Sequence, residues 1–121
     1  MPHYLLLLRD DPADFRELSP ADMQRIIETY TAWSEKMTAS GRVVASNKLA
    51  DEGGKVLRGS KGRFLVKDGP FAETKEIVSG YWVVRARDYA EALELVKDHP
   101  HLATNGSIEV REVDLLGQPD G

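Results

Sequence analysis

Cysteine is absent from this 121-residue chain. Without thiols the protein cannot form disulfides, use a thiol nucleophile or bind a metal through thiolates. The absence fits a reducing compartment, and we expect the protein in the cytoplasm. We assign no cofactor and no metal site from the sequence.

Long hydrophobic runs are also lacking. The most apolar segment, Leu5 to Leu8, suits a buried strand and is far shorter than the roughly 20 residues of a membrane-spanning helix. It begins too early for a signal peptide, and it lacks the basic leader and small-residue cleavage site. We therefore expect no membrane association.

An excess of positive charge is lacking as well. The chain has 16 basic and 20 acidic residues, a net charge of −4, and the basic residues are scattered rather than gathered in one run. General affinity for nucleic acid is therefore not expected. Length and ordinary composition indicate one soluble globular domain, which we place at residues 1–117, with a loose tail at 118–121.

What the chain does have is a dense turn-and-charge segment, Asp68 to Glu76. Asp68-Gly69 is a turn dipeptide, and Pro70 fixes its own φ and restricts Gly69. Because proline has no N–H, the Asp68 carboxylate must find another donor, a partner from another element, or water. Phe71 is expected to anchor the loop in the core. The remaining charges of the segment come from Glu73, Lys75 and Glu76.

The hydrophobic pattern along the chain predicts six strands and two helices. Ser19 is expected to cap the first helix, which Gly41 ends, and Asp88 with Glu91 forms a capping box for the second. Gly80 is expected to leave a gap in its strand that another side chain or a ligand could approach. The predicted strands cover residues 3–8, 43–49, 55–58, 63–67, 77–85 and 107–115.

This order predicts an α+β fold of the ferredoxin-like (dimeric α/β-barrel) type, with a mainly antiparallel sheet and two helices on one face. Apolar residues occur on both faces of the first strand and of the strand at 77–85. An uncovered apolar face is usually hidden by self-association, so we predict a homodimer that pairs sheet to sheet.

The segment Asp68 to Glu76 resembles the signature of the DGPF-domain, YCII-related family of small bacterial proteins. The resemblance extends to Val56-Leu57-Arg58 and Gly62 before the signature, and to Gly80-Tyr81 and Ile108 to Arg111 after it. It therefore covers nearly the whole chain.

The resemblance implies a ferredoxin-like domain that dimerises around its sheet. The wider superfamily includes an enzyme that removes chloride from a hydroxylated aromatic, and its members are often described with a His–Asp pair in a cleft. DGPF proteins are also associated with extracytoplasmic-function-type sigma factors. The chain departs from the family in two places: its first helix has Tyr30 and Trp33 but no histidine, and Glu112 stands where proline is common.

Asp68 is the predicted catalytic carboxylate, because a partly buried Asp in a cleft can act as a general acid or base. The rival interpretation is a capping or ion-pair role that holds the loop. His99 and His101 could chelate a metal, but no third ligand is near them, and we assign them instead to the end of the second helix. Trp33 and Trp82 are expected in the core. The predicted ligand-binding residues are Arg58, Arg63, Phe71, Glu73, Lys75 and Arg111.

Two functions remain open. One is a small-molecule enzyme, lyase- or isomerase-like, with an acidic residue at the dimer cleft. The alternative is a non-catalytic regulatory or ligand-binding module that acts with a sigma factor, and a small-ligand sensor would combine the two.

Overall fold

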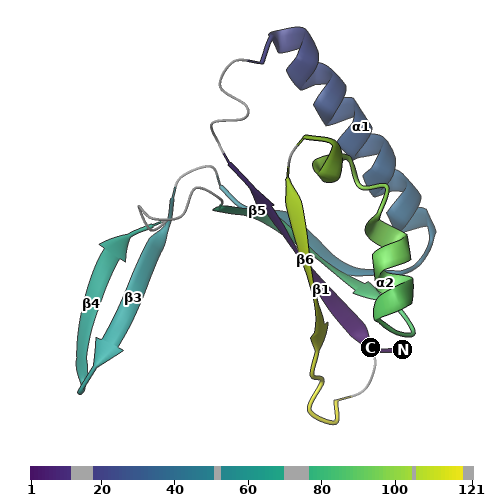
Figure 1. The fold of residues 1–121 in the computed structure, drawn as a ribbon. Helices are drawn as coiled ribbons and strands as arrows, with labels where there is room; N and C mark the ends of the chain where they lie inside the picture. Colours follow the sequence, from purple (N-terminus) through teal and green to yellow (C-terminus); the bar gives the residue numbers. More distant parts are fainter. Residues whose placement is uncertain (12–17, 51–52, 70–76, 105, 119–121) are drawn as a thin grey trace.

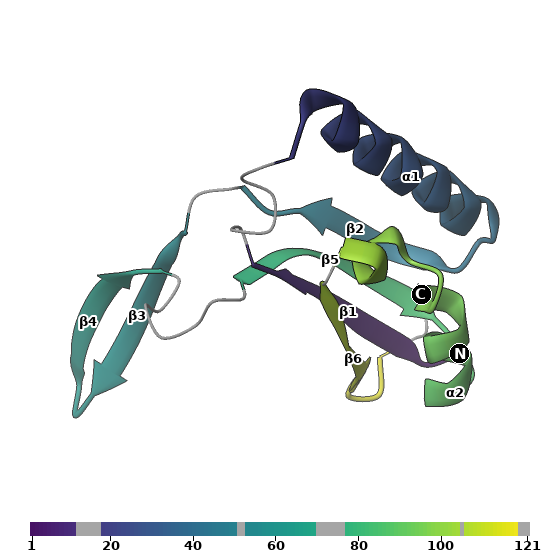
Figure 2. The ribbon, with the colours of Figure 1, turned by 45° about the horizontal axis from the view of Figure 1, so that its top comes forward.

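The computed structural model describes residues 1–11, 18–50, 53–69, 77–104 and 106–118. Figures 1 and 2 show a sheet with helices on one face and a separate β-hairpin that extends away from it. The elements are β1 (His3–Asp10), α1 (Pro20–Ala39), β2 (Val43–Lys48), β3 (Lys55–Ser60), β4 (Arg63–Asp68), β5 (Ile77–Arg85), α2 (Tyr89–Val96), the 3-10 helix η2 (Pro100–Thr104) and β6 (Ser107–Val113).

The main sheet has four strands in the order β2-β5-β1-β6, and every neighbouring pair is antiparallel. Strand β1 lies inside the sheet, as its apolar sequence predicted. Leu6, for example, lies opposite Trp82 of β5 and Val110 of β6. This strand order, with one helix in each crossover, confirms the predicted ferredoxin-like α+β class.

The core lies between the sheet and the two helices. Tyr4, Leu6 and Leu8 alternate along β1 toward the helices, and α1 contributes Trp33 and Met37. The rings of Trp33 and Trp82 are nearly perpendicular, with centroids 5.0 Å apart, a favourable edge-to-face arrangement. Both tryptophans are buried, which confirms that they belong to the core.

The helix ends follow the chemistry that the sequence predicted. The Ser19 side chain accepts a hydrogen bond from the Asp22 backbone N–H at 3.1 Å, and Pro20 takes the first helical position. Gly41, just beyond the end of α1, has a φ of 75°, a conformation that glycine adopts without strain. At α2, the Asp88 carboxylate accepts from the Glu91 N–H at 2.9 Å.

The gap expected at Gly80 is filled by the protein itself. A Cβ at this position would lie 3.1 Å from the Asn47 carbonyl oxygen and 3.5 Å from the Lys48 Cα. The backbone of β2 therefore approaches β5 closely at Gly80. A register shift also occurs close by, between Leu8 and Arg9 of β1.

Strands β3 and β4 form a two-stranded sheet of their own, which projects from the body (Figures 1 and 2). The turn between them has Lys61 at a φ of 50° and Gly62 at 81°, as a tight two-residue hairpin of type I′ requires. The sequence predicted both strands, but not that they would leave the main sheet. Within the described residues, no helix is long and apolar enough to cross a membrane.

Candidate functional site

Most residues predicted as a site lie on or beside the projecting hairpin. Asp68 ends β4 and forms an ion pair with Lys55 across the hairpin, and its side chain is 84% exposed. Within one chain it is therefore not enclosed in a cleft. Whether it acts in catalysis stays a prediction.

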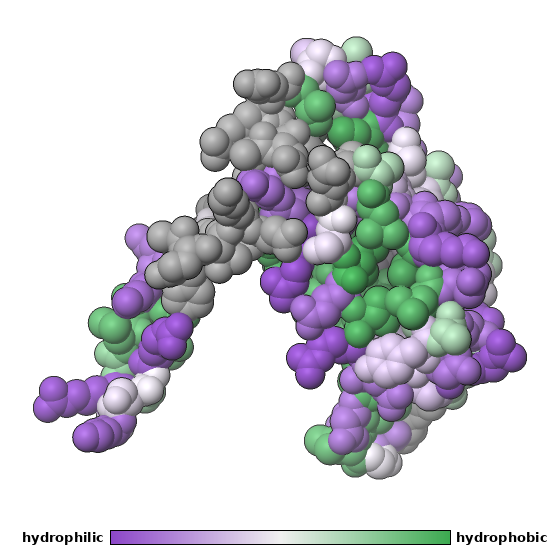
Figure 3. All heavy atoms as spheres, in the orientation of Figure 1, coloured by the Kyte–Doolittle hydropathy of each residue, from purple (hydrophilic) through white to green (hydrophobic). Residues whose placement is uncertain are grey.

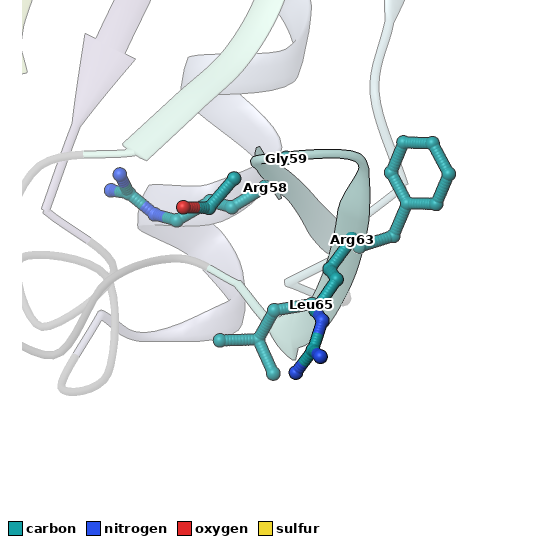
Figure 4. A pocket seen from close by; sticks show the side chains of 6 residues that line it. Arg58, Gly59, Arg63 and Leu65 are labelled. Atoms are coloured by element: carbon teal, nitrogen blue, oxygen red, sulfur yellow. The ribbon is translucent and has the colours of Figure 1, made fainter.

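The predicted ligand-binding arginines do not come together in one chain. Arg58 and Arg63 line an open hollow at the tip of the hairpin, and their side chains extend in different directions (Figure 4). Arg111 lies on β6 of the main sheet, opposite Leu5. The other predicted ligand-binding residues, Phe71, Glu73 and Lys75, lie outside the described residues.

A second group of polar side chains, which the sequence did not connect, meets between α1 and the segment that follows α2. It consists of Asp10 at the end of β1, Tyr30 on α1, and His99 and His101 around the start of η2. In Figure 1 the turn that follows α2 lies beside α1. Three segments that are distant in the sequence thus contribute to one cluster.

His101 is hydrogen-bonded at both ring nitrogens. Its Nε2 lies 2.6 Å from the Arg9 carbonyl oxygen, and its Nδ1 lies 2.6 Å from the Tyr30 hydroxyl. Because a carbonyl only accepts, Nε2 carries the hydrogen, and in the neutral ring Nδ1 then accepts from the Tyr30 O–H. The imidazole is 1% exposed, so its orientation and tautomer are fixed by the protein.

A carboxylate stands close to this pair. Asp10 Oδ2 lies 4.0 Å from His101 Nδ1, and the Asp10 side chain is 13% exposed. Burial, and secondarily the negative charge of Asp10, raise the pKa of Tyr30. The phenol therefore stays protonated at neutral pH and remains able to donate.

Gly106 makes room for the His101 ring. A Cβ on Gly106 would overlap the ring and would lie 2.7 Å from the His101 carbonyl oxygen, closer than non-bonded atoms approach. The Gly106 N–H also donates to that carbonyl at 3.1 Å. The glycine before β6 thus fits tightly against the imidazole.

His99 holds the His101 backbone in place and packs against α1. Its Nδ1 accepts from the His101 backbone N–H at 2.9 Å, and its ring packs on Trp33 with centroids 4.2 Å apart. Burial lowers the pKa of His99 to about 4; the nearby His101 adds to this and Asp98 opposes it. His99 is therefore neutral at pH 7, and among the described residues its buried Nε2 has no hydrogen-bond partner.

Asp98 fastens the segment to α1. Its carboxylate accepts from Trp33 Nε1 at 3.1 Å and from Lys36 Nζ at 2.8 Å. These two hydrogen bonds hold the pKa of Asp98 below its usual value, and the bond from Lys36 has the larger effect. They place His99 and His101 against the face of α1 that carries Tyr30.

The structure corrects the assignment of the two histidines to the end of α2. Helix α2 ends at Val96, and both imidazoles turn into the protein, where they are 2% and 1% exposed. The sequence signal was present in the His-Pro-His spacing and in Tyr30 on an otherwise apolar helix face. Their meeting depends on how α1 crosses the sheet, which local pattern does not reveal.

The cluster is suited to proton transfer. The hydroxyl of the partly exposed Tyr30 is hydrogen-bonded to the His101 imidazole, whose Nδ1 can accept its proton, and the Asp10 carboxylate lies beside that nitrogen. Among the described residues, no group of three or more His, Asp or Glu side chains is arranged to hold a metal ion.

Comparisons with known proteins extend over the same region. The family model described as YCII-related domain matches residues 3–115. An uncharacterised protein of Rhizobium meliloti (strain 1021) is 30% identical over 114 residues, which are 93% of this chain and 92% of that protein.

A solved structure shows the same fold. It is that of 5-chloro-2-hydroxyhydroquinone dehydrochlorinase from Burkholderia phenoliruptrix AC1100, in complex with 2,5-dihydroxybenzoquinone. The TM-score is 0.51 and the sequence identity 14%, and the match covers 93% of each chain.

Proposed function

The chain belongs to the YCII-related domain family, and we propose that it is a small-molecule enzyme, lyase- or isomerase-like, that transfers protons at Asp10, Tyr30 and His101. The observation that carries the proposal is that both ring nitrogens of His101 are hydrogen-bonded, one to the Arg9 carbonyl oxygen and the other to the Tyr30 hydroxyl, each at 2.6 Å. An imidazole fixed in this way is ready to accept a proton without reorientation.

In the proposed step, a C–H or O–H proton of the substrate moves to the Tyr30 oxygen as the Tyr30 proton moves to His101 Nδ1. The electron pair left on the substrate shifts a double bond, as in an isomerase, or expels a leaving group, as in a lyase. The resulting imidazolium lies 4.0 Å from Asp10, whose negative charge stabilises it. Because His101 is buried, the substrate meets Tyr30 and Asp10, and His101 acts through Tyr30.

We further propose a homodimer that pairs sheet to sheet. The face of the main sheet opposite the helices, which we call the open face, carries the half-buried Leu5 and Leu7 of β1 and Tyr81 and Val83 of β5. Apolar side chains on an uncovered sheet face favour association with a second such face.

The site residues predicted on and near the hairpin remain a separate proposal. Asp68 is the competing assignment to Asp10 for the working carboxylate. Asp68, and Arg58, Arg63 and Arg111 as anion-binding groups, would need elements from a second copy to surround them. The alternative function, a regulatory module bound to a sigma factor, requires neither turnover nor an ordered imidazole.

The test is turnover of a panel of hydroxylated aromatics and quinones, including chlorinated hydroxyhydroquinones, followed by absorbance and chloride release. We expect Tyr30→Phe to lower kcat at least about a hundredfold on whichever panel compound is turned over. Tyr4→Phe is the control, because it removes the same hydroxyl from another core tyrosine, one that donates to Glu112 at 3.1 Å, at a distance from the cluster.

Two results would overturn the proposal. One is equal activity of Tyr30→Phe and Tyr4→Phe. The other is a wild-type protein that turns over no compound in the panel and whose Asp10, Tyr30 and His101 NMR signals do not respond to 2,5-dihydroxybenzoquinone. The second result would favour the binding-module alternative.

A further inference from the structure

The β3–β4 hairpin has two chemically different faces. Directly opposed residues of an antiparallel pair share a face, so Leu57 with Val66, and Gly59 with Phe64, lie on one side. We call this side the apolar face of the hairpin. Val56 with Lys67, Arg58 with Leu65, and Ser60 with Arg63 lie on the other side, which we call the basic face because three of its six side chains are basic.

The apolar face is exposed to an extent that a folded monomer rarely allows. Leu57 is 62% exposed, Phe64 is 77% and Val66 is 61%. The ring of Phe64 lies over Gly59, with two ring carbons 3.9 Å from the position of a Cβ there. Figure 3 shows apolar and charged side chains side by side on the projecting hairpin.

A hairpin of this kind needs a partner. Two strands alone are marginally stable in water, and a third layer or a packed surface is needed to hold them. Strands β3 and β4 pair with each other in a two-stranded sheet, and the hairpin extends away from the body in both ribbon views (Figures 1 and 2). Exposed apolar surface on such an arm indicates a docking surface.

Charge identifies the occupant. Residues 55–68 carry five basic side chains and one acidic side chain, a net charge of +4, whereas the whole chain has −4, so the remainder carries −8. The opposite net charges of arm and body favour the approach of the arm to the body of another copy of this chain at long range, although Arg58, Arg63 and Lys67 lie on the face that would stay outward. The same pairing occurs twice in a symmetric dimer. The basic residues of the arm are Lys55, Arg58, Lys61, Arg63 and Lys67.

We propose that the apolar face of the hairpin docks on a second copy of this chain, as an arm that reaches over the partner's body. The inference rests on the proposed homodimer and adds a contact that pairing of the open faces alone does not require. The Lys55–Asp68 pair lies at the base of the same hairpin face. Docking would therefore also cover Asp68, which is exposed in one chain.

The experiment is a comparison of Leu57→Asp with Leu65→Asp by sedimentation equilibrium of the full-length protein. The two positions are leucines of similar exposure, 62% and 55%, on opposite faces of the same hairpin. We expect Leu57→Asp to weaken the dimer Kd at least about tenfold, because each copy would place a charge against the partner. Leu65→Asp should leave the Kd within about threefold of wild type.

Amide hydrogen exchange of β3 and β4 gives a second readout, since protection there should rise with protein concentration in the wild type and in Leu65→Asp. If Leu57→Asp dimerises as tightly as Leu65→Asp, the docked arm is refuted while pairing of the open faces stands. A wild-type protein that stays monomeric at about 100 μM would refute both, without bearing on turnover at Tyr30.

Discussion

His101 has little freedom to move, because both ring nitrogens are hydrogen-bonded and Gly106 lies against the ring. A proton acceptor benefits from such rigidity, since no reorganisation is needed when the proton arrives. The sequence contained the residues of the cluster but gave no sign that they meet. Asp10 followed a strand and Tyr30 belonged to an apolar helix face, and only the crossing of α1 over the sheet joins them to His101.

Gly106→Ala tests the fit of the imidazole. The new Cβ would displace the His101 ring, and we expect a loss of about 1–3 kcal/mol in unfolding free energy together with loss of turnover. Urea unfolding is the measurement. Gly59→Ala is the control, because its nearest contacts would be at 3.7 Å or beyond, as in ordinary packing. Equal effects of the two substitutions would contradict the predicted overlap.

His99 gives the protein a specific pH dependence. Its folded pKa is lowered to about 4 from an ordinary 6.5, so the unfolded chain binds the proton more readily than the folded one. The stability due to neutral His99 is complete above pH 6.5 and is lost as the pH falls toward 4. The loss approaches about 3 kcal/mol at the lower end of that range.

Urea unfolding at pH 7 and pH 5 of the wild type and His99→Gln measures this dependence. The variant should lose much less stability between the two pH values than the wild type does. The lowered pKa values of Asp22, Glu91 and Asp98 act at more acidic pH, below their ordinary values of 3.8 to 4.5, and do not interfere. Parallel losses in the two proteins would show that His99 is not the titrating group.

At the scale of the elements, local chemistry was a reliable guide. The caps at Ser19 and Asp88, the stop at Gly41 and the span of β5 follow from residue type and alternation. Two features did not follow. The residue pattern of β3 and β4 is that of strands whether or not they join the main sheet, so their separation from it was not predicted. The close approach of the β2 backbone to Gly80 was not predicted either.

The second helix offers a test of its cap. Asp88→Ala removes the side chain that accepts from the Glu91 N–H, and we expect a loss of about 1 kcal/mol in unfolding free energy. Asp88→Asn, which keeps an acceptor at the same position, should lose clearly less. Thermal unfolding of both variants checks this, and equal losses would mean that the charge rather than the cap matters.

At the scale of the whole molecule, two surfaces remain for a partner: the open face of the sheet and the apolar face of the hairpin. Five of the 16 basic residues lie in the segment 55–67 that forms the hairpin, so a chain with a net charge of −4 has a basic arm and an acidic body. The net charge of the whole chain does not show that the two charges are separated in this way, because it is a sum over all residues. The apolar residues on both faces of β1 did predict that one face would be left uncovered.

The proposed proton transfer requires that the working carboxylate is Asp10 beside His101 and not Asp68 on the hairpin. The direct measurement is kcat/KM of Asp10→Asn and Asp68→Asn on the first panel compound turned over, with the melting temperature of each variant. We predict that Asp10→Asn loses at least about a hundredfold and that Asp68→Asn stays close to wild type. Loss of turnover in Asp68→Asn at an unchanged melting temperature, with Asp10→Asn still active, would contradict the account.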